Sequence, residues 1–123
     1  SNADGYELRT SNYTSTTTNV EFRYKGDVAS IGFGTLTNNI WYHLTATGTS
    51  GAQLVYINGI QVFSNNIATT PTANSNNLSI GKLSYSGLYT NMTLGFARIY
   101  NRVLSNSEIL NNYNMTKSRF GLN

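Results

Sequence analysis

The stretch that decides the fold is Leu94–Tyr113, LGFARIYNRVLSNSEILNNY. Branched and aromatic residues in Met92–Tyr100 suit a pleated surface and predict the last long strand of the chain. Ser105 and Glu108 then have the spacing of a capping box, in which each side chain bonds the backbone N–H of the other residue. A small apolar stripe follows and predicts one short helix that docks on a sheet: Ile109, Leu110 and Tyr113.

Outward from this stretch, the chain consists of short strand patterns separated by turn residues. Asn58-Gly59 is a strong hairpin signal, because both positions of a type I′ turn need a positive φ. Ile40–Thr47 is partly apolar on both faces, which predicts a central strand. The pattern predicts an all-β, antiparallel β-sandwich of the jelly-roll type with one short C-terminal helix. The other predicted strands are Gly5–Arg9, Asn19–Lys25, Val28–Gly34, Leu54–Ile57, Ile60–Phe63 and Leu78–Leu83.

Length and composition limit the class of protein. The 123 residues suit a single domain, which we place at residues 4–123 because Ser1-Asn2-Ala3 has the composition of a scar left by tag cleavage. With no cysteine, the chain has neither disulfides nor cysteine-based metal sites. No apolar run has the length of a transmembrane span, so we expect no membrane insertion.

The net charge of +3 leaves two interpretations of the basic residues open. They either form a patch for an anionic partner or are solvated charge that keeps the domain soluble. No basic run is interleaved with stacking aromatics, so the sequence does not favour nucleic acid as a partner. Four of these residues lie in the last quarter of the chain: Arg98, Arg102, Lys117 and Arg119.

Four segments carry a resemblance to a known family. They are IWYHL (40–44), VYINGIQV (55–62), LSIG (78–81) and GFARIYNRVLSNSEI (95–109), in that order. Together they resemble the laminin G-like branch of the concanavalin A-like lectin/glucanase sandwiches, over roughly Ile40–Tyr113. The ending Lys117–Leu122 also resembles the ends of domains in phage and viral structural proteins. The resemblance implies a module on the extracellular or virion surface.

The resemblance also bears on association. Domains of this family begin with a strand that pairs near the C-terminal one, whereas the similarity here starts at the second or third strand. A missing strand would leave Met92–Tyr100 with unpaired N–H and C=O groups, which invite pairing with another chain. We therefore predict a homo-oligomer or a strand partner from the parent protein, unless Gly5–Arg9 fills that position.

The acidic residues do not support catalysis. Glycosidases of the wider superfamily use two carboxylates that flank one bond. Glu108 is engaged in the capping box, whereas Glu7 and Glu21 lie on different predicted strands, so we predict that the protein is not an enzyme. The lone histidine, His43, lies beside Trp41 on a predicted strand and is more typical of a packed structural residue than of a catalytic or metal-binding one.

The sequence yields one candidate ligand site, in a polar loop near the C-terminal strand. Tyr85, Tyr89 and Asn91 offer aromatic faces for sugar C–H groups and an amide for hydroxyls. The alternative is that these are turn and sheet-rim residues. The resemblance implies calcium as a possible ligand, because some laminin G-like domains bind it at a loop rim. Asp27 is the candidate acidic residue for such a site in this sequence.

The function predicted from these observations is a non-catalytic binding module for a glycan or cell-surface polysaccharide. It would belong to a phage, viral or extracellular structural protein. The alternative is a purely structural module that mediates assembly between proteins. Fold similarity carries much of this prediction, and a fold does not fix a function.

Overall fold

The computed structural model describes residues 6–11, 16–24, 31–49, 51–66, 75, 77–82, 87 and 89–123. Its strands form two antiparallel sheets, with the orders β1-β2-β3 and β4-β5-β6. The first sheet contains β1 (Tyr6–Ser11), β2 (Thr17–Tyr24) and β3 (Ile31–Thr37), and the second contains β4 (Leu44–Thr49), β5 (Ala52–Ile57) and β6 (Ile60–Asn65). The helix α1 (Asn106–Thr116) and the short 3-10 helix η1 (Lys117–Phe120) follow.

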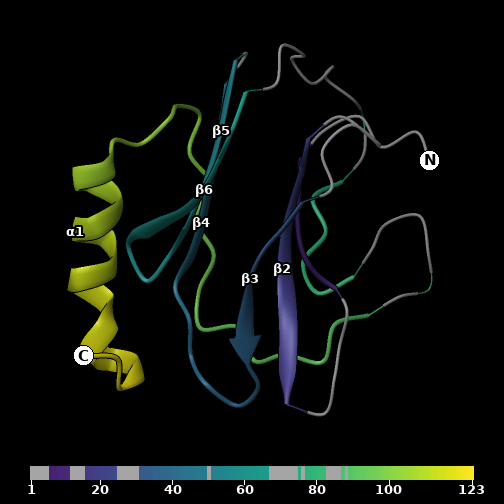
Figure 1. Ribbon diagram of the computed structural model, residues 1–123. Helices are drawn as coiled ribbons and strands as arrows, with labels where there is room; N and C mark the ends of the chain where they lie inside the picture. The colour runs from purple at the N-terminus through teal and green to yellow at the C-terminus, as the bar shows by residue number, and fades with distance from the viewer. Residues whose placement is uncertain are drawn as a thin grey trace.

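The two sheets pack face to face, and α1 covers the outer face of the β4-β5-β6 sheet (Figure 1). The core between the sheets is built from buried residues of both: Val20, Phe22, Leu36 and Val55. Strict alternation in β2 turns Val20 and Phe22 to this core, as the sequence pattern predicts. The predicted fold class, an antiparallel β-sandwich with one short C-terminal helix, is confirmed.

The central strand of the second sheet is β5, not the predicted Ile40–Thr47. Val55 and Tyr56 are 0% and 1% exposed, because Val55 faces the core between the sheets and Tyr56 faces α1. The predicted strand also starts too early, since β4 begins at Leu44. Residues 40–43 keep the predicted alternation of faces but lie outside the ladder.

The helix and its cap are confirmed. Ser105 is the N-cap, and the capping box with Glu108 is complete. Ile109, which is fully buried, packs with Leu104 and Tyr56 on the outer face of the second sheet. Leu110, which the sequence places in one apolar stripe with Ile109 and Tyr113, is 45% exposed.

The predicted hairpin at Asn58-Gly59 is also confirmed. Asn58 has φ 53° and Gly59 has φ 78°, and both lie between β5 and β6. A Cβ atom on Gly59 would lie 3.0 Å from Leu110 Cδ1 and 3.3 Å from Tyr113. Gly59 is therefore required twice, by the backbone conformation and by the close approach of α1.

Two predicted strands are wrong. Leu78–Leu83 has no ladder in its described part, residues 78–82, only an isolated bridge between Lys82 and Tyr89. Met92–Tyr100 has no strand assignment at any residue. Strand propensity takes effect only when a partner strand is in place, and within the described residues no strand pairs with this segment.

The Met92–Tyr100 segment contacts the helical C-terminus instead. Its Phe96 ring lies 5.9 Å from the ring of Phe120, and the Tyr100 hydroxyl accepts a 3.3 Å hydrogen bond from Asn112. The guanidinium group of Arg98 also lies over the Phe96 ring, 4.9 Å from its centroid. The segment thus closes the molecule through side chains rather than through a β-ladder.

The remaining strand predictions are close to the structure. The predicted strands at Gly5–Arg9 and Asn19–Lys25 appear as β1 and β2, which pair with each other. The predicted Val28–Gly34 strand appears as β3 from Ile31, and residues 28–30 lie outside the described residues.

Candidate binding surface

Tyr89 and Asn91 lie on an exposed connection, and Tyr89 pairs with Lys82 in an isolated antiparallel bridge. The backbone N–H of Thr90 donates to the carbonyl of Gly81 at 2.9 Å, and Lys82 and Tyr89 form the antiparallel bridge. Gly81 has φ +74°, a conformation that side-chain-bearing residues rarely adopt. These two contacts fix the loop base that carries Tyr89.

The Tyr89 ring is open to solvent. It is 72% exposed, and the Nζ atom of Lys82 lies 5.8 Å from its centroid. Asn91, two residues later, is also exposed. The structure therefore presents an aromatic face, an ammonium and an amide on one short connection, the kinds of groups that contact sugar C–H surfaces and hydroxyls. Tyr85, the third predicted site residue, lies outside the described residues.

The first sheet brings together the two carboxylates that the sequence left apart. Because β1 pairs with β2, Arg9 lies opposite Glu21. Its Nε atom donates to Glu21 Oε2 at 2.7 Å, and its Nη1 atom is 3.9 Å from Glu7 Oε1. Glu21 is only 7% exposed, so the guanidinium compensates a carboxylate removed from water. This arrangement holds β1 to β2.

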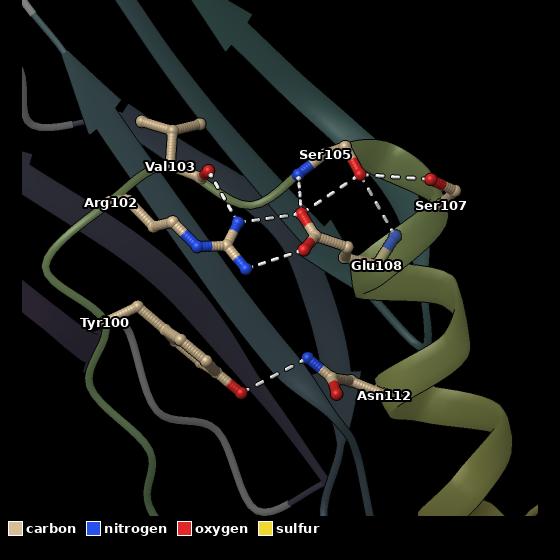
Figure 2. Close-up of polar contacts among 7 residues, drawn as sticks. All are labelled: Tyr100, Arg102, Val103, Ser105, Ser107, Glu108 and Asn112. Atoms are coloured by element: carbon tan, nitrogen blue, oxygen red, sulfur yellow. Dashed lines mark hydrogen bonds and ion pairs between the residues drawn. The ribbon is translucent and has the colours of Figure 1, made fainter.

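The third described carboxylate belongs to the start of α1 (Figure 2). The Glu108 Oε2 atom accepts from the Ser105 backbone N–H at 2.8 Å, and the Glu108 N–H donates to Ser105 Oγ at 3.3 Å. Arg102 adds two hydrogen bonds to the same carboxylate, of 3.0 and 2.6 Å. The Arg102 hydrogen bonds, followed by the Ser105 N–H, lower the pKa of Glu108 to about 2. Glu108 is therefore a capping anion.

His43 is held between elements rather than opened to a ligand. Both backbone polar groups of His43 are bonded to Asn58. The His43 N–H donates to Asn58 Oδ1 at 2.9 Å, and the His43 carbonyl accepts from the Asn58 N–H at 2.8 Å. Its ring lies 6.0 Å from the rings of both Phe96 and Tyr113. Burial and the nearby Arg98 charge lower the pKa of His43. These contacts fit the predicted structural role.

Metal ligands are not gathered in the part of the chain that the structure describes. Within it, no group of three histidine or acidic side chains is arranged to hold a metal ion. Asp27, the acid singled out for calcium, lies outside the described residues. In the same part of the chain, no helix has the length and apolarity needed to cross a membrane.

Sequence reasoning missed one feature, an aromatic cluster at the junction of the second sheet and the helical C-terminus. The Trp41 and Phe120 ring centroids are 4.8 Å apart, and Phe96 joins Phe120 to His43. We define the aromatic cluster as Trp41, His43, Phe96, Tyr113 and Phe120. One signal could have found it: Gly95 interrupts a strand-like pattern, which often marks a close approach. A Cβ atom on Gly95 would lie 2.5 Å from two ring carbons of Phe120.

Comparison with solved structures identifies one relative of the fold. It is the crystal structure of residues 221–444 of an S-layer domain-containing protein from Clostridium thermocellum ATCC 27405. The TM-score is 0.58 at 21% sequence identity, over 90% of this chain and 64% of that one, so this chain spans less than two thirds of that segment. A search of the curated proteins finds no match.

The family comparison covers most of the sequence. The Laminin G 3 family model, described as concanavalin A-like lectin/glucanases superfamily, matches residues 1–110. The match begins earlier than the resemblance at Ile40–Tyr113 and ends inside α1. It agrees with the two antiparallel sheets and with the predicted family. The chain therefore belongs to the concanavalin A-like lectin/glucanases superfamily.

Proposed function

We propose that this domain is a non-catalytic binding module that recognises a glycan or cell-surface polysaccharide. The observation that carries the proposal is Tyr89, 72% exposed on a bridged turn, with Lys82 beside its ring and Asn91 close in the chain. An aromatic ring that is exposed to solvent while its backbone is held by hydrogen bonds is a good stacking platform. Little conformational freedom is then lost on binding. Tyr85 is proposed as a second contact.

The carboxylates support the non-catalytic part of the proposal. Glycoside hydrolysis needs one protonated acid and one ionised partner on opposite sides of the scissile bond. Among the described side chains, Glu7 and Glu21 are both near Arg9, and Glu108 is bonded to Arg102 and Ser105. None of the three is placed as an isolated acid facing a second carboxylate.

The place of action is proposed as the extracellular surface. The S-layer domain-containing protein with a similar fold favours a structural protein of a cell surface. A virion surface rests on the weaker resemblance of the Lys117–Leu122 ending and stays a prediction.

A glycan array, run with and without calcium, tests the proposal. Tyr89→Ala should weaken binding to the strongest glycan while leaving the melting temperature nearly unchanged, since the ring is exposed. Tyr6→Ala is the matched control, because Tyr6 is a similarly exposed tyrosine, 66% exposed, on β1. Binding that survives Tyr89→Ala would remove the site. Loss of binding on chelation would assign a role to calcium, which we propose only as an optional ligand.

The alternative function is assembly between protein chains. One observation favours it: within the described residues, no backbone–backbone hydrogen bond involves Met92–Tyr100. Four of its side chains are exposed although apolar or aromatic: Met92 48%, Leu94 50%, Ile99 73% and Tyr100 43%. An unpaired apolar segment can accept a strand from a second copy.

Light scattering at micromolar concentration tests assembly. A dimer that dissociates in Ile99→Lys supports pairing through this segment, because Ile99 is 73% exposed and a lysine there guards an edge. A chain that stays monomeric at all concentrations would exclude pairing with a second copy and leave a strand of the parent protein as the remaining partner. The glycan site would then function without an added strand.

A further inference from the structure

Three cations at the C-terminus have no carboxylate partner among the described side chains. Arg98, Lys117 and Arg119 appear in no ion pair, whereas Arg102, the fourth basic residue of this region, is bonded to Glu108 at 2.6 Å. The described carboxylates are already engaged, since Glu7 and Glu21 lie by Arg9 and Glu108 lies by Arg102. Of the four basic residues in this region, one is thus paired with a carboxylate and three are not.

Each of the three uncompensated cations lies over one ring of the aromatic cluster. The Arg98 guanidinium carbon lies 4.9 Å from the Phe96 centroid, and that of Arg119 lies 5.9 Å from the Phe120 centroid. The Lys117 Nζ atom lies 5.7 Å from the Tyr113 centroid. A cation over a ring is held in place by the ring face while its other N–H groups stay free to donate.

One ring of this cluster is open to a ligand. Trp41 is 37% exposed, and its recorded ring contact is with Phe120 at 4.8 Å, with the planes tilted by 45°. Beside it, Ile40 is 54% exposed. An exposed indole offers a sugar ring a stacking surface, and the guanidinium groups over the Phe96 and Phe120 rings of the same cluster offer hydrogen-bond donors to an anionic substituent.

We infer that this cluster is a second binding site, which takes an acidic polysaccharide. Trp41 would stack on a sugar ring, and Arg98 and Arg119 would bind its carboxylate or sulfate groups. The site shares no residue with the proposed Tyr89 site and does not depend on the proposed function. Its helical residues, Tyr113–Phe120, lie beyond residue 110, where the family match ends, so family membership does not imply it.

The charge favours an acidic polysaccharide over nucleic acid. Three uncompensated cations and a net charge of +3 are few for a nucleic-acid surface, where affinity comes from many phosphate contacts. An acidic polysaccharide also presents sugar faces that an exposed indole can cover.

Binding of heparin and polygalacturonate, with dextran as the uncharged control, tests the inference. Trp41 is the one tryptophan of the chain, so its fluorescence reports on the site directly. The inference predicts a fluorescence change with both polyanions and none with dextran. The double variant R98Q/R119Q should lose roughly tenfold in affinity, since hydrogen bonds to charged groups are the strong ones.

Arg102→Gln is the control for the single variants R98Q and R119Q, because each removes one positive charge from the same region but Arg102 is already paired with Glu108. Its polyanion affinity should stay within about twofold of the unchanged chain, as expected for a paired surface charge. Equal losses in R98Q, R119Q and R102Q, each of which removes one charge, would overturn the site and leave only general electrostatic attraction. Tighter binding of single-stranded DNA than of either polysaccharide would overturn the choice of ligand.

The outcome is distinguishable from that of the proposed function. Tyr89→Ala should leave polyanion binding and the Trp41 signal unchanged, because Tyr89 is not a member of the aromatic cluster. If R98Q/R119Q lowers the melting temperature, near-ultraviolet circular dichroism at a temperature below both transitions decides whether the loss is of binding or of folding. An unaltered spectrum with unaltered affinity would also overturn the inference.

Discussion

Substituting Gly59 by alanine should destabilise the fold through two separate costs. The residue has φ +78°, and a left-handed conformation costs an alanine about 1–2 kcal/mol. The added Cβ would also lie 3.0 Å from Leu110 Cδ1 and 3.3 Å from Tyr113, in α1. Overpacking of that kind costs roughly 1–3 kcal/mol, so the total should be about 2–5 kcal/mol.

Gly51→Ala provides the matched control for this prediction. Gly51 has φ +99° in the turn between β4 and β5, but a Cβ there meets nothing within 4 Å. It should therefore show only the conformational cost, about 1–2 kcal/mol. Urea denaturation followed by far-ultraviolet circular dichroism measures both variants. Equal losses in the two would refute the close packing of α1 on the Asn58-Gly59 turn.

Two further predictions concern the C-terminal region, and a third concerns His43. Ser105→Ala should cost about 0.5–2 kcal/mol in urea denaturation, as caps generally do, and an unchanged midpoint would contradict the docking of α1. Gly95→Ala should displace Phe120 and shift the Trp41 fluorescence, whereas Gly87→Ala, with nothing within 4 Å, should not. Because the pKa of His43 is lowered in the fold, stability should fall as pH drops below about 6.5, and His43→Gln should flatten this dependence.

Local signals predicted the helix and the hairpin correctly. The capping box joins Ser105 and Glu108, three positions apart, and the Asn58-Gly59 turn needs only its own two residues. Such contacts form within a few residues and depend little on the rest of the fold, so the sequence contains what is needed to recognise them.

Contacts between distant segments could not be predicted. Met92–Tyr100 has the composition of a strand, but pairing depends on which backbone lies beside it, and here Phe120 and Asn112 of the helical C-terminus lie there. For the same reason, the contact between the Trp41 and Phe120 rings could not be predicted from the sequence. The pairing of β1 with β2, which places Arg9 by Glu21, likewise follows from topology.

For the candidate site, the sequence indicated exposure but not surroundings. Tyr89 and Asn91 lie in a polar loop, which predicts exposure, and both are exposed. Lys82 was not selected, because its position beside the Tyr89 ring depends on a bridge across the turn that sequence spacing does not reveal.

The most direct test of the central claim measures binding and turnover of one glycan in the same sample. The strongest ligand from the array is incubated with the protein, and bound glycan and newly formed reducing ends are both quantified. The account predicts that the glycan is bound and recovered intact, and that Tyr89→Ala abolishes the binding. Reducing ends that accumulate with the unchanged chain and disappear with Glu21→Gln would contradict it, because the Glu21 carboxylate would then act in catalysis rather than in the pair with Arg9.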